Sequence, residues 1–169
     1  MAATYTPIAT TTLGSAAANI TFSSIAGTYT DLVLVVSAIT ASNDQSIYFN
    51  VNSDSGTNYS YTYLYGNGTS ALSGRGTNAT QGFLGGVAYG TSTSTPSAIV
   101  ASFMNYANTT TYKTIIGRGN MFRNDGNGDA EAQVTLWRST AAINTIAVRA
   151  SSGNLSAGTT ATLYGIKAA

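Results

Sequence analysis

The sequence predicts an all-β protein: an antiparallel β-sandwich, jelly-roll-like, with about 11 strands. Short apolar or alternating runs recur along the chain, and each is bounded by turn residues. Polarity comes from Thr, Ser, Asn and Gly rather than from Lys and Glu, a composition that favours strands and turns over helices. No stretch combines a 3.6-residue apolar period with helix caps.

The expected strands end where residues that tolerate positive φ occur, as in Asp54-Ser55-Gly56 and Gly66-Asn67-Gly68. The expected strands are Tyr5–Thr11, Ala18–Phe22, Asp31–Ile39, Ser46–Val51, Tyr59–Tyr65, Gln81–Ala88, Ala98–Asn105, Thr111–Arg118, Glu131–Arg138, Ile143–Ala150 and Thr159–Lys167. The 169 residues fit one sandwich domain over residues 1–169, with residues 1–16 either inside it or forming an N-terminal arm.

The chain contains no histidine and no cysteine, and it has seven basic and six acidic residues. Without histidine and cysteine, Ser-His-Asp triads, Cys-His dyads and zinc sites cannot be built. The six carboxylates do not suggest the facing pair that a glycosidase needs. We therefore expect a protein that is not an enzyme, with no catalytic residue and no cofactor.

The distribution of charge and hydrophobicity also bears on partners. Basic residues are scattered and never form a run, so the sequence predicts neither nucleic-acid nor membrane binding. The first residues have no basic and apolar segments of a secretory signal, and no apolar run reaches the length of a membrane-spanning helix.

The run Asp31–Ile39 is apolar on both faces, whereas a sandwich strand normally buries one face and exposes the other. It is therefore either a central strand beneath a loop or part of a subunit interface.

A row of tyrosines is the most distinctive local pattern. Because alternate residues of a strand share a face, the spacing predicts that four rings lie side by side. The row could pack into the core, form a protein interface or stack on sugar rings. The residues are Tyr59, Tyr61, Tyr63 and Tyr65.

Two Gly/Ser/Thr-rich segments, Asn67–Gly82 and Ala88–Pro96, are expected to be loops. They are either contact loops presented by a rigid scaffold or simply mobile segments. Asn67 and Arg75, in the first segment, join the tyrosine row as interface candidates.

The run from Asp125 to Glu131 places oxygen ligands at alternate positions, as the opening of a calcium loop does. Asp125, Asn127 and Asp129 are the candidate ligands. Ala130 stands where an EF-hand has glycine, and Leu136 where it has glutamate. An Asn/Asp/Gly turn between two strands explains the same residues.

Three stretches, Ile20–Leu34, Asn58–Gly68 and Ala161–Lys167, carry a resemblance to a protein family. In them the chain resembles the small virion structural proteins of tailed bacteriophages, especially phages of cyanobacteria and marine bacteria. Members are labelled capsid decoration (cement) or tail-fibre proteins. The resemblance implies a β-sandwich without a catalytic signature, and it transfers no binding residue.

The resemblance leads us to expect a virion protein that binds the outer capsid surface and reinforces contacts between major capsid subunits. Its partners would be the major capsid protein and, in a homo-oligomer, further copies of itself. The alternative is a tail-fibre or receptor-binding module that recognises host-surface saccharide through the tyrosine row. A catalytic role, such as glycan hydrolysis, is the third and least favoured reading.

Overall fold

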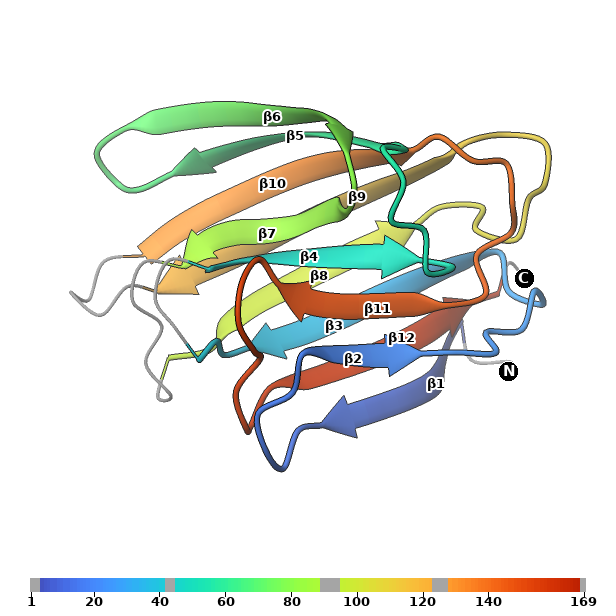
Figure 1. Ribbon diagram of the computed structural model, residues 1–169, viewed down its shortest axis with the longest axis horizontal. Coiled ribbons are helices and arrows are strands. Elements are labelled where there is room, and N and C mark those ends of the chain that lie inside the picture. The colour runs from blue at the N-terminus through green and yellow to red at the C-terminus, as the bar shows by residue number, and fades with distance from the viewer. Residues whose placement is uncertain (1–3, 42–44, 89–94, 123–127, 168–169) are drawn as a thin grey trace.

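The computed structural model describes residues 4–41, 45–88, 95–122 and 128–167. These residues form twelve strands and no helix, and the strands are arranged in two sheets packed face to face (Figure 1). The strands are β1 (Tyr5–Thr12), β2 (Asn19–Phe22), β3 (Asp31–Ala38), β4 (Gln45–Val51), β5 (Tyr59–Gly66), β6 (Ala71–Ala79), β7 (Gly82–Ala88), β8 (Ser97–Phe103), β9 (Lys113–Phe122), β10 (Gly128–Trp137), β11 (Ile146–Ala150) and β12 (Thr160–Ile166).

One sheet, hereafter the large sheet, has eight strands in the order β1-β12-β3-β8-β9-β10-β5-β6, and the small sheet has the order β2-β11-β4-β7. All neighbouring strands are antiparallel. The predicted all-β antiparallel sandwich is therefore confirmed, with twelve strands instead of about 11.

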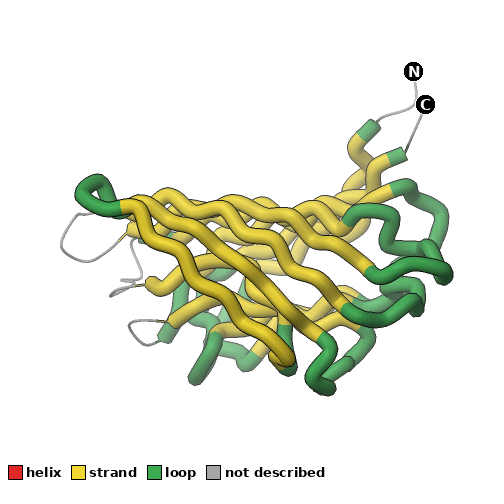
Figure 2. The backbone as a smooth tube through the Cα atoms, turned by 90° about the horizontal axis from the view of Figure 1, so that it is seen from above, coloured by secondary structure: helices red, strands yellow, loops and turns green. Residues whose placement is uncertain are grey.

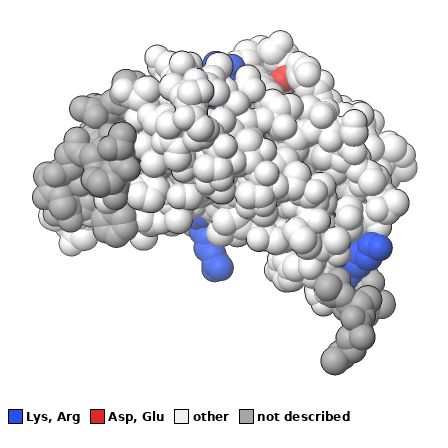
Figure 3. Space-filling model, turned by 90° about the horizontal axis from the view of Figure 1, so that it is seen from below, with Lys and Arg blue, Asp and Glu red and all other residues white. Residues whose placement is uncertain are grey.

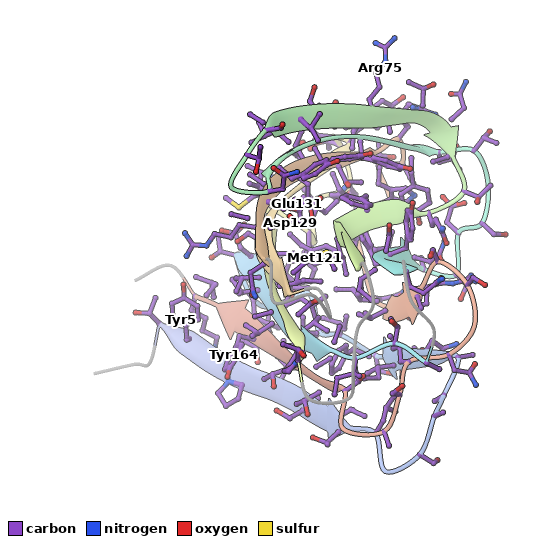
Figure 4. All side chains as sticks on the ribbon, turned by 90° about the vertical axis from the view of Figure 1, so that its left-hand side faces the viewer. Tyr5, Arg75, Met121, Asp129, Glu131 and Tyr164 are labelled. Carbon is purple, nitrogen blue, oxygen red and sulfur yellow. The ribbon has the colours of Figure 1, made fainter. Side chains whose placement is uncertain are left out.

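Successive strands alternate between the two sheets, except at β5–β6 and from β8 to β10, where consecutive strands belong to the large sheet. We interpret the remaining strands as a jelly-roll-like pair of sheets, β1-β12-β3-β8 against β2-β11-β4-β7. The two added hairpins widen the large sheet, which curves over the edge of the small sheet (Figure 4).

The core fills the space between the sheets because each strand directs alternate side chains inward. In β3 the inward residues Leu32, Leu34 and Val36 are fully buried. The strand is central, between β12 and β8, as one interpretation of Asp31–Ile39 required. Its other face carries Val33, which is partly buried, and Val35, which is 37% exposed on the outside of the sandwich, so the loop that this interpretation placed over the strand does not bury Val35.

Strand β6 corrects the prediction that Asn67–Gly82 is a loop. Ala71–Ala79 pairs along β5, although its Gly, Ser and Asn residues have low strand propensity. The turn before it is closed by Asn67, whose Oδ1 accepts hydrogen bonds from the N–H groups of Thr69 and Ser70 at 3.0 and 2.7 Å. Residues Ala71–Ala79 therefore form a strand because they pair with β5, and not because of their own composition.

The first strand belongs to the sandwich. β1 pairs with β12 from Tyr5↔Ile166 to Thr12↔Thr160, so residues 5–12 are an edge strand and not a detached arm. The first and last strands consequently lie side by side at one end of the molecule (Figures 1 and 2). Within the described ranges, the chain has no helix that could span a lipid bilayer.

Candidate interaction surface

The tyrosine row lies on the inner face of β5, where it is turned toward the small sheet. Tyr59 is fully buried, and its hydroxyl accepts a hydrogen bond from Val51 N–H at 3.1 Å and donates one to the Asp54 carbonyl at 3.2 Å. Burial raises the pKa of Tyr59 to about 12. Tyr59 is therefore a core residue and offers no contact surface.

The next two rings of the row are covered by the edge of the small sheet. Tyr61 and Tyr63 lie against Phe83 of β7, with ring centroids 5.3 and 4.8 Å apart. Their other sides are close to Gly76 and Gly74, where an added Cβ would lie 2.4 Å from ring atoms. The two glycines therefore make room for the rings, which are half-buried between β6 and β7.

The other interface candidates lie nearer the surface. Tyr65 continues the row and is half-buried, with its ring 6.3 Å from that of Tyr63. Arg75 is exposed on β6 and points away from the molecule (Figure 4). Asn67 shapes the β5–β6 turn. The structure thus places the candidates at one end of the large sheet, but on different faces of it.

In the part of the run that the structure describes, the candidate ligands do not have the arrangement that a calcium site needs. Asp125 and Asn127 lie outside the described residues, whereas Asp129 belongs to β10 and faces inward with 7% of its surface exposed. Across residues 4–41, 45–88, 95–122 and 128–167, no group of three or more acidic side chains could hold a metal ion.

The inner face of β10 carries a row of polar side chains, hereafter the β10 polar row: Asp129, Glu131, Gln133 and Thr135. All four are buried, and three of them hydrogen-bond to the backbone of β7, the edge strand of the small sheet. Figure 4 shows Asp129 and Glu131 between the two sheets. Sequence reasoning did not identify this row.

Each contact of the row satisfies a backbone group that a neighbouring strand would otherwise satisfy. The Thr135 hydroxyl accepts from Phe83 N–H at 3.3 Å and donates to the Phe83 carbonyl at 3.1 Å. The Gln133 amide donates to the carbonyl of Leu84, and Glu131 Oε2 accepts from Gly86 N–H at 2.6 Å. Because buried peptide groups need partners, these side chains take the place of a missing strand.

Glu131 is the most perturbed acid of the row. Burial raises the pKa of its carboxyl, the Gly86 N–H opposes this rise, and the nearby charge of Asp129 adds to it. The result is a pKa of about 7 instead of the ordinary 4.5. The carboxyl is tied to the scaffold, so its perturbation is explained by burial within the fold.

Two other described acids cap turns. Asp54 accepts hydrogen bonds from the indole Nε1–H of Trp137 at 2.6 Å and from Gly56 N–H at 2.8 Å. Asp31 accepts from Asn105 N–H at 2.6 Å. Lys113 is buried as well, and its Nζ donates to the backbone carbonyls of two loops. These charged side chains therefore stabilise the scaffold.

The side of the large sheet that faces away from the small sheet, hereafter the outer face, has the opposite character. Across five adjacent strands of this face, paired positions carry Val33, Ser102, Ile116, Val134 and Thr62. Ile116 and Leu64 are exposed by 55% and 61%. Exposed apolar side chains that are contiguous, and not single, mark interaction surfaces.

The outer face is shallowly hollowed. One hollow of about 290 Å³ is lined by Tyr5, Val33, Val100, Ser102, Ile116 and Arg118. A second of about 180 Å³ lies beside it, lined by Thr62, Leu64, Ile116 and Val134 among others. Both are open and too shallow to enclose a substrate, which suits contact with another surface.

Charge on the described surface is sparse. Figure 3 shows one side of the molecule on which isolated basic side chains and a small acidic patch lie in an otherwise uncharged surface. On the outer face Arg118 lines the first of these hollows, and Arg75 lies on the edge strand. Apart from Arg118, the paired positions across the outer face are uncharged, and depletion of charged residues is a feature of protein interfaces.

The sequence was also compared with known families and proteins. No family model matches the chain, and the comparison with curated proteins gives no significant match.

Proposed function

We propose that this chain is a bacteriophage virion protein without enzymatic activity that decorates the capsid. In this proposal it binds the outer capsid surface and reinforces contacts between major capsid subunits. The observation that carries the proposal is the outer face, a broad, nearly uncharged sheet surface with contiguous exposed apolar side chains. The resemblance of three sequence stretches to phage virion proteins supports the choice of partner.

The chemistry of the outer face fits a docking role. Val35, Ile116 and Val134 provide apolar area, while Ser102 and Thr62 provide hydroxyls that can exchange water for hydrogen bonds to a partner. A rigid sheet presents them without ordering a loop, so little conformational entropy is lost on binding. Repetition over a shell lets modest individual contacts sum to a large stabilisation.

The tail-fibre alternative relied on the tyrosine row as a platform for sugar rings. Because Tyr59 is buried and Tyr61 and Tyr63 lie against Phe83, that platform does not face solvent. No observation on the described residues therefore favours saccharide recognition by the row.

The test is to add the purified protein to capsid shells that lack it. Binding is measured by co-sedimentation, and reinforcement by the temperature at which the shells open. We expect Ile116→Glu and Val134→Glu to lose binding at least tenfold, because each buries a charge in the contact. Thr21→Glu, on the exposed outside of the small sheet, is the matched control and should bind normally.

Two outcomes would contradict the proposal. One is a protein that neither binds the shells nor raises their opening temperature. The other is an equal loss of binding in the Thr21→Glu control, which would show that binding does not depend specifically on the outer face. Counting copies per particle gives an independent check, because decoration requires on the order of hundreds of copies whereas a tail component requires far fewer.

A further inference from the structure

The edges of the two sheets are protected very unequally. An open edge presents unpaired N–H and C=O groups, and proteins usually shorten it, interrupt it or cover it. β1 contains Pro7 and a register irregularity between Pro7 and Ala9. β2 has only four residues. The edge of β7 is covered by the β10 polar row. Each of these edges therefore carries a device against further pairing.

β6 carries no such device along the stretch that pairs regularly with β5. Its nine residues contain no proline, and their only charge is Arg75. From Ala71 to Gly76 the register with β5 is uninterrupted, and the irregularity comes after this stretch. In Figure 1 β6 forms the rim of the large sheet, with no strand beyond it.

The pairing pattern identifies which peptide groups of β6 are free. Asn67 N–H donates to the Ser70 carbonyl at 3.2 Å, which closes the hairpin. Hydrogen-bonded and non-hydrogen-bonded pairs then alternate along an antiparallel ladder. The peptide groups of Ala71, Ser73 and Arg75 consequently point away from β5, and no described residue bonds to them.

We propose that β6 is a self-association edge on which the β6 strand of a second copy of this chain pairs in antiparallel orientation, centred on Ser73. In this register Ser73 lies opposite Ser73 of the second copy, and Ala71 lies opposite Arg75. The free peptide groups of the two edges then meet as hydrogen-bonded pairs. Two large sheets become one continuous sheet across a twofold axis.

The side chains of β6 make this register self-complementary. Leu72 projects from the inner face with 44% of its surface exposed, and it falls opposite Gly74 of the second copy. The Tyr63 ring covers Gly74 on this face, so the leucine of each copy would pack against the Tyr63 side chain of the other, and each copy supplies both partners of this contact. An unrelated partner strand has no reason to match this pattern, whereas a second copy matches it by symmetry.

The one charge on the strand does not oppose this pairing. In the Ser73-centred register the two Arg75 residues lie about 13 Å apart along the strands. This separation exceeds the screening length of about 8 Å at physiological ionic strength, so their repulsion is largely screened. A register centred on Arg75 would place like charges directly opposite each other, which destabilises a sheet. Charge therefore selects the Ser73-centred register.

Cysteine cross-linking tests the register directly, because the chain contains no cysteine of its own. Hydrogen-bonded antiparallel residues have Cα atoms about 5.5 Å apart, which a disulfide can span. We expect Ser73→Cys to give a covalent dimer under mild oxidation. Thr77→Cys is the matched control on the same strand. Its two copies would lie about 27 Å apart, so it should remain monomeric.

A backbone variant tests the edge itself in the full-length protein. Ser73→Pro removes a free N–H without breaking a bond to β5, so it should keep the fold and weaken the dimer at least tenfold in sedimentation equilibrium. Ser73→Ala keeps the N–H and should dimerise as the wild type does. Fluorescence of the buried Trp137 reports whether each variant is folded.

Three results would overturn the proposal: a wild-type chain that is monomeric at millimolar concentration, equal cross-linking of Ser73→Cys and Thr77→Cys, or a folded Ser73→Pro variant that still dimerises. A monomer whose edge instead captures an unrelated extended peptide would also overturn it. None of these results bears on capsid binding through the outer face, so the two proposals fail separately.

Discussion

Replacing Glu131 by glutamine should change how the stability of the protein depends on pH. Glu131 lies in the β10 polar row with 7% of its surface exposed, and its Oε2 accepts a hydrogen bond from Gly86 N–H at 2.6 Å. Glutamine keeps a carbonyl oxygen for this bond and cannot ionise. The substitution therefore removes the charge while it preserves the contact with β7.

The direction follows from the raised pKa. Burial, together with the charge of Asp129, holds the pKa of Glu131 at about 7, against an ordinary value of 4.5. The folded state therefore holds the proton more tightly than the unfolded state. Its stabilising effect is fully present below pH 4.5 and is lost as the pH rises to about 7. Above that pH, the wild type contains a buried carboxylate.

The magnitude follows from the same two values. At ~1.36 kcal/mol per pKa unit, the interval between them corresponds to about 3 kcal/mol as an upper limit. Solvent screening at the end of the sandwich reduces the expected effect to about 1.5–2 kcal/mol. Glu131→Gln should therefore match the wild type near pH 4 and exceed its free energy of unfolding by this amount near pH 8.

The assay is urea unfolding followed by the fluorescence of Trp137, the chain's single tryptophan, between pH 4 and pH 8.5. The difference between variant and wild type isolates Glu131, because the other acids titrate in both proteins. A difference that does not change with pH would refute the reasoning. So would a wild type that becomes more stable than the variant above pH 7.

Three further substitutions test other contacts by the same unfolding assay. Thr135→Val removes the hydroxyl that bonds the N–H and carbonyl of Phe83, and it should cost about 1–3 kcal/mol, whereas Thr135→Ser should recover most of this. Gly76→Ala would place a Cβ 2.4 Å from the Tyr61 ring and should destabilise the protein by about 1–3 kcal/mol, but by less in a Tyr61→Ala background. At Asp54, burial raises the carboxyl pKa, but hydrogen bonds, the largest from the tryptophan indole, outweigh burial and lower the pKa below 3.8. The stability that ionised Asp54 contributes is therefore lost as the pH falls below 3.8. Asp54→Asn should remove this dependence of the free energy of unfolding on pH.

The all-β class and most strands could be predicted because apolar alternation and turn residues are local properties of the sequence. β6 could not, because Ala71–Ala79 has the composition of a loop. It forms a strand because β5 pairs with it and because Gly74 and Gly76 accept the rings of the tyrosine row. Such a strand is specified by its neighbour, and a single segment of sequence does not contain that information.

β10 shows a second limit. Its polar residues Glu131, Gln133 and Thr135 face inward, and its small apolar residues, such as Ala132 and Val134, face outward. A pattern of alternation identifies a strand but not which of its faces is buried. The inversion follows from the position of the edge of β7, a tertiary fact that alternation cannot reveal.

The candidate interface was predicted less completely than the fold. The spacing of Tyr59, Tyr61, Tyr63 and Tyr65 correctly indicated one shared face, and the structure turns that face toward Phe83. The exposed apolar outer face draws its residues from strands far apart in the sequence, so no local motif marks it. The apolar outer side of Asp31–Ile39 was its one visible signal, and its role as an interface remains a prediction.

The pairing of Tyr5 with Ile166 determines how the protein would respond to mechanical force. Both described ends of the chain leave the same corner of an antiparallel ladder, so a load applied between them would break its hydrogen bonds one after another, as in a zipper. Pressure spread over the broad sheet would instead be shared by many strands at once. A molecule tethered by its two ends should therefore yield easily, whereas one seated on its sheet should resist.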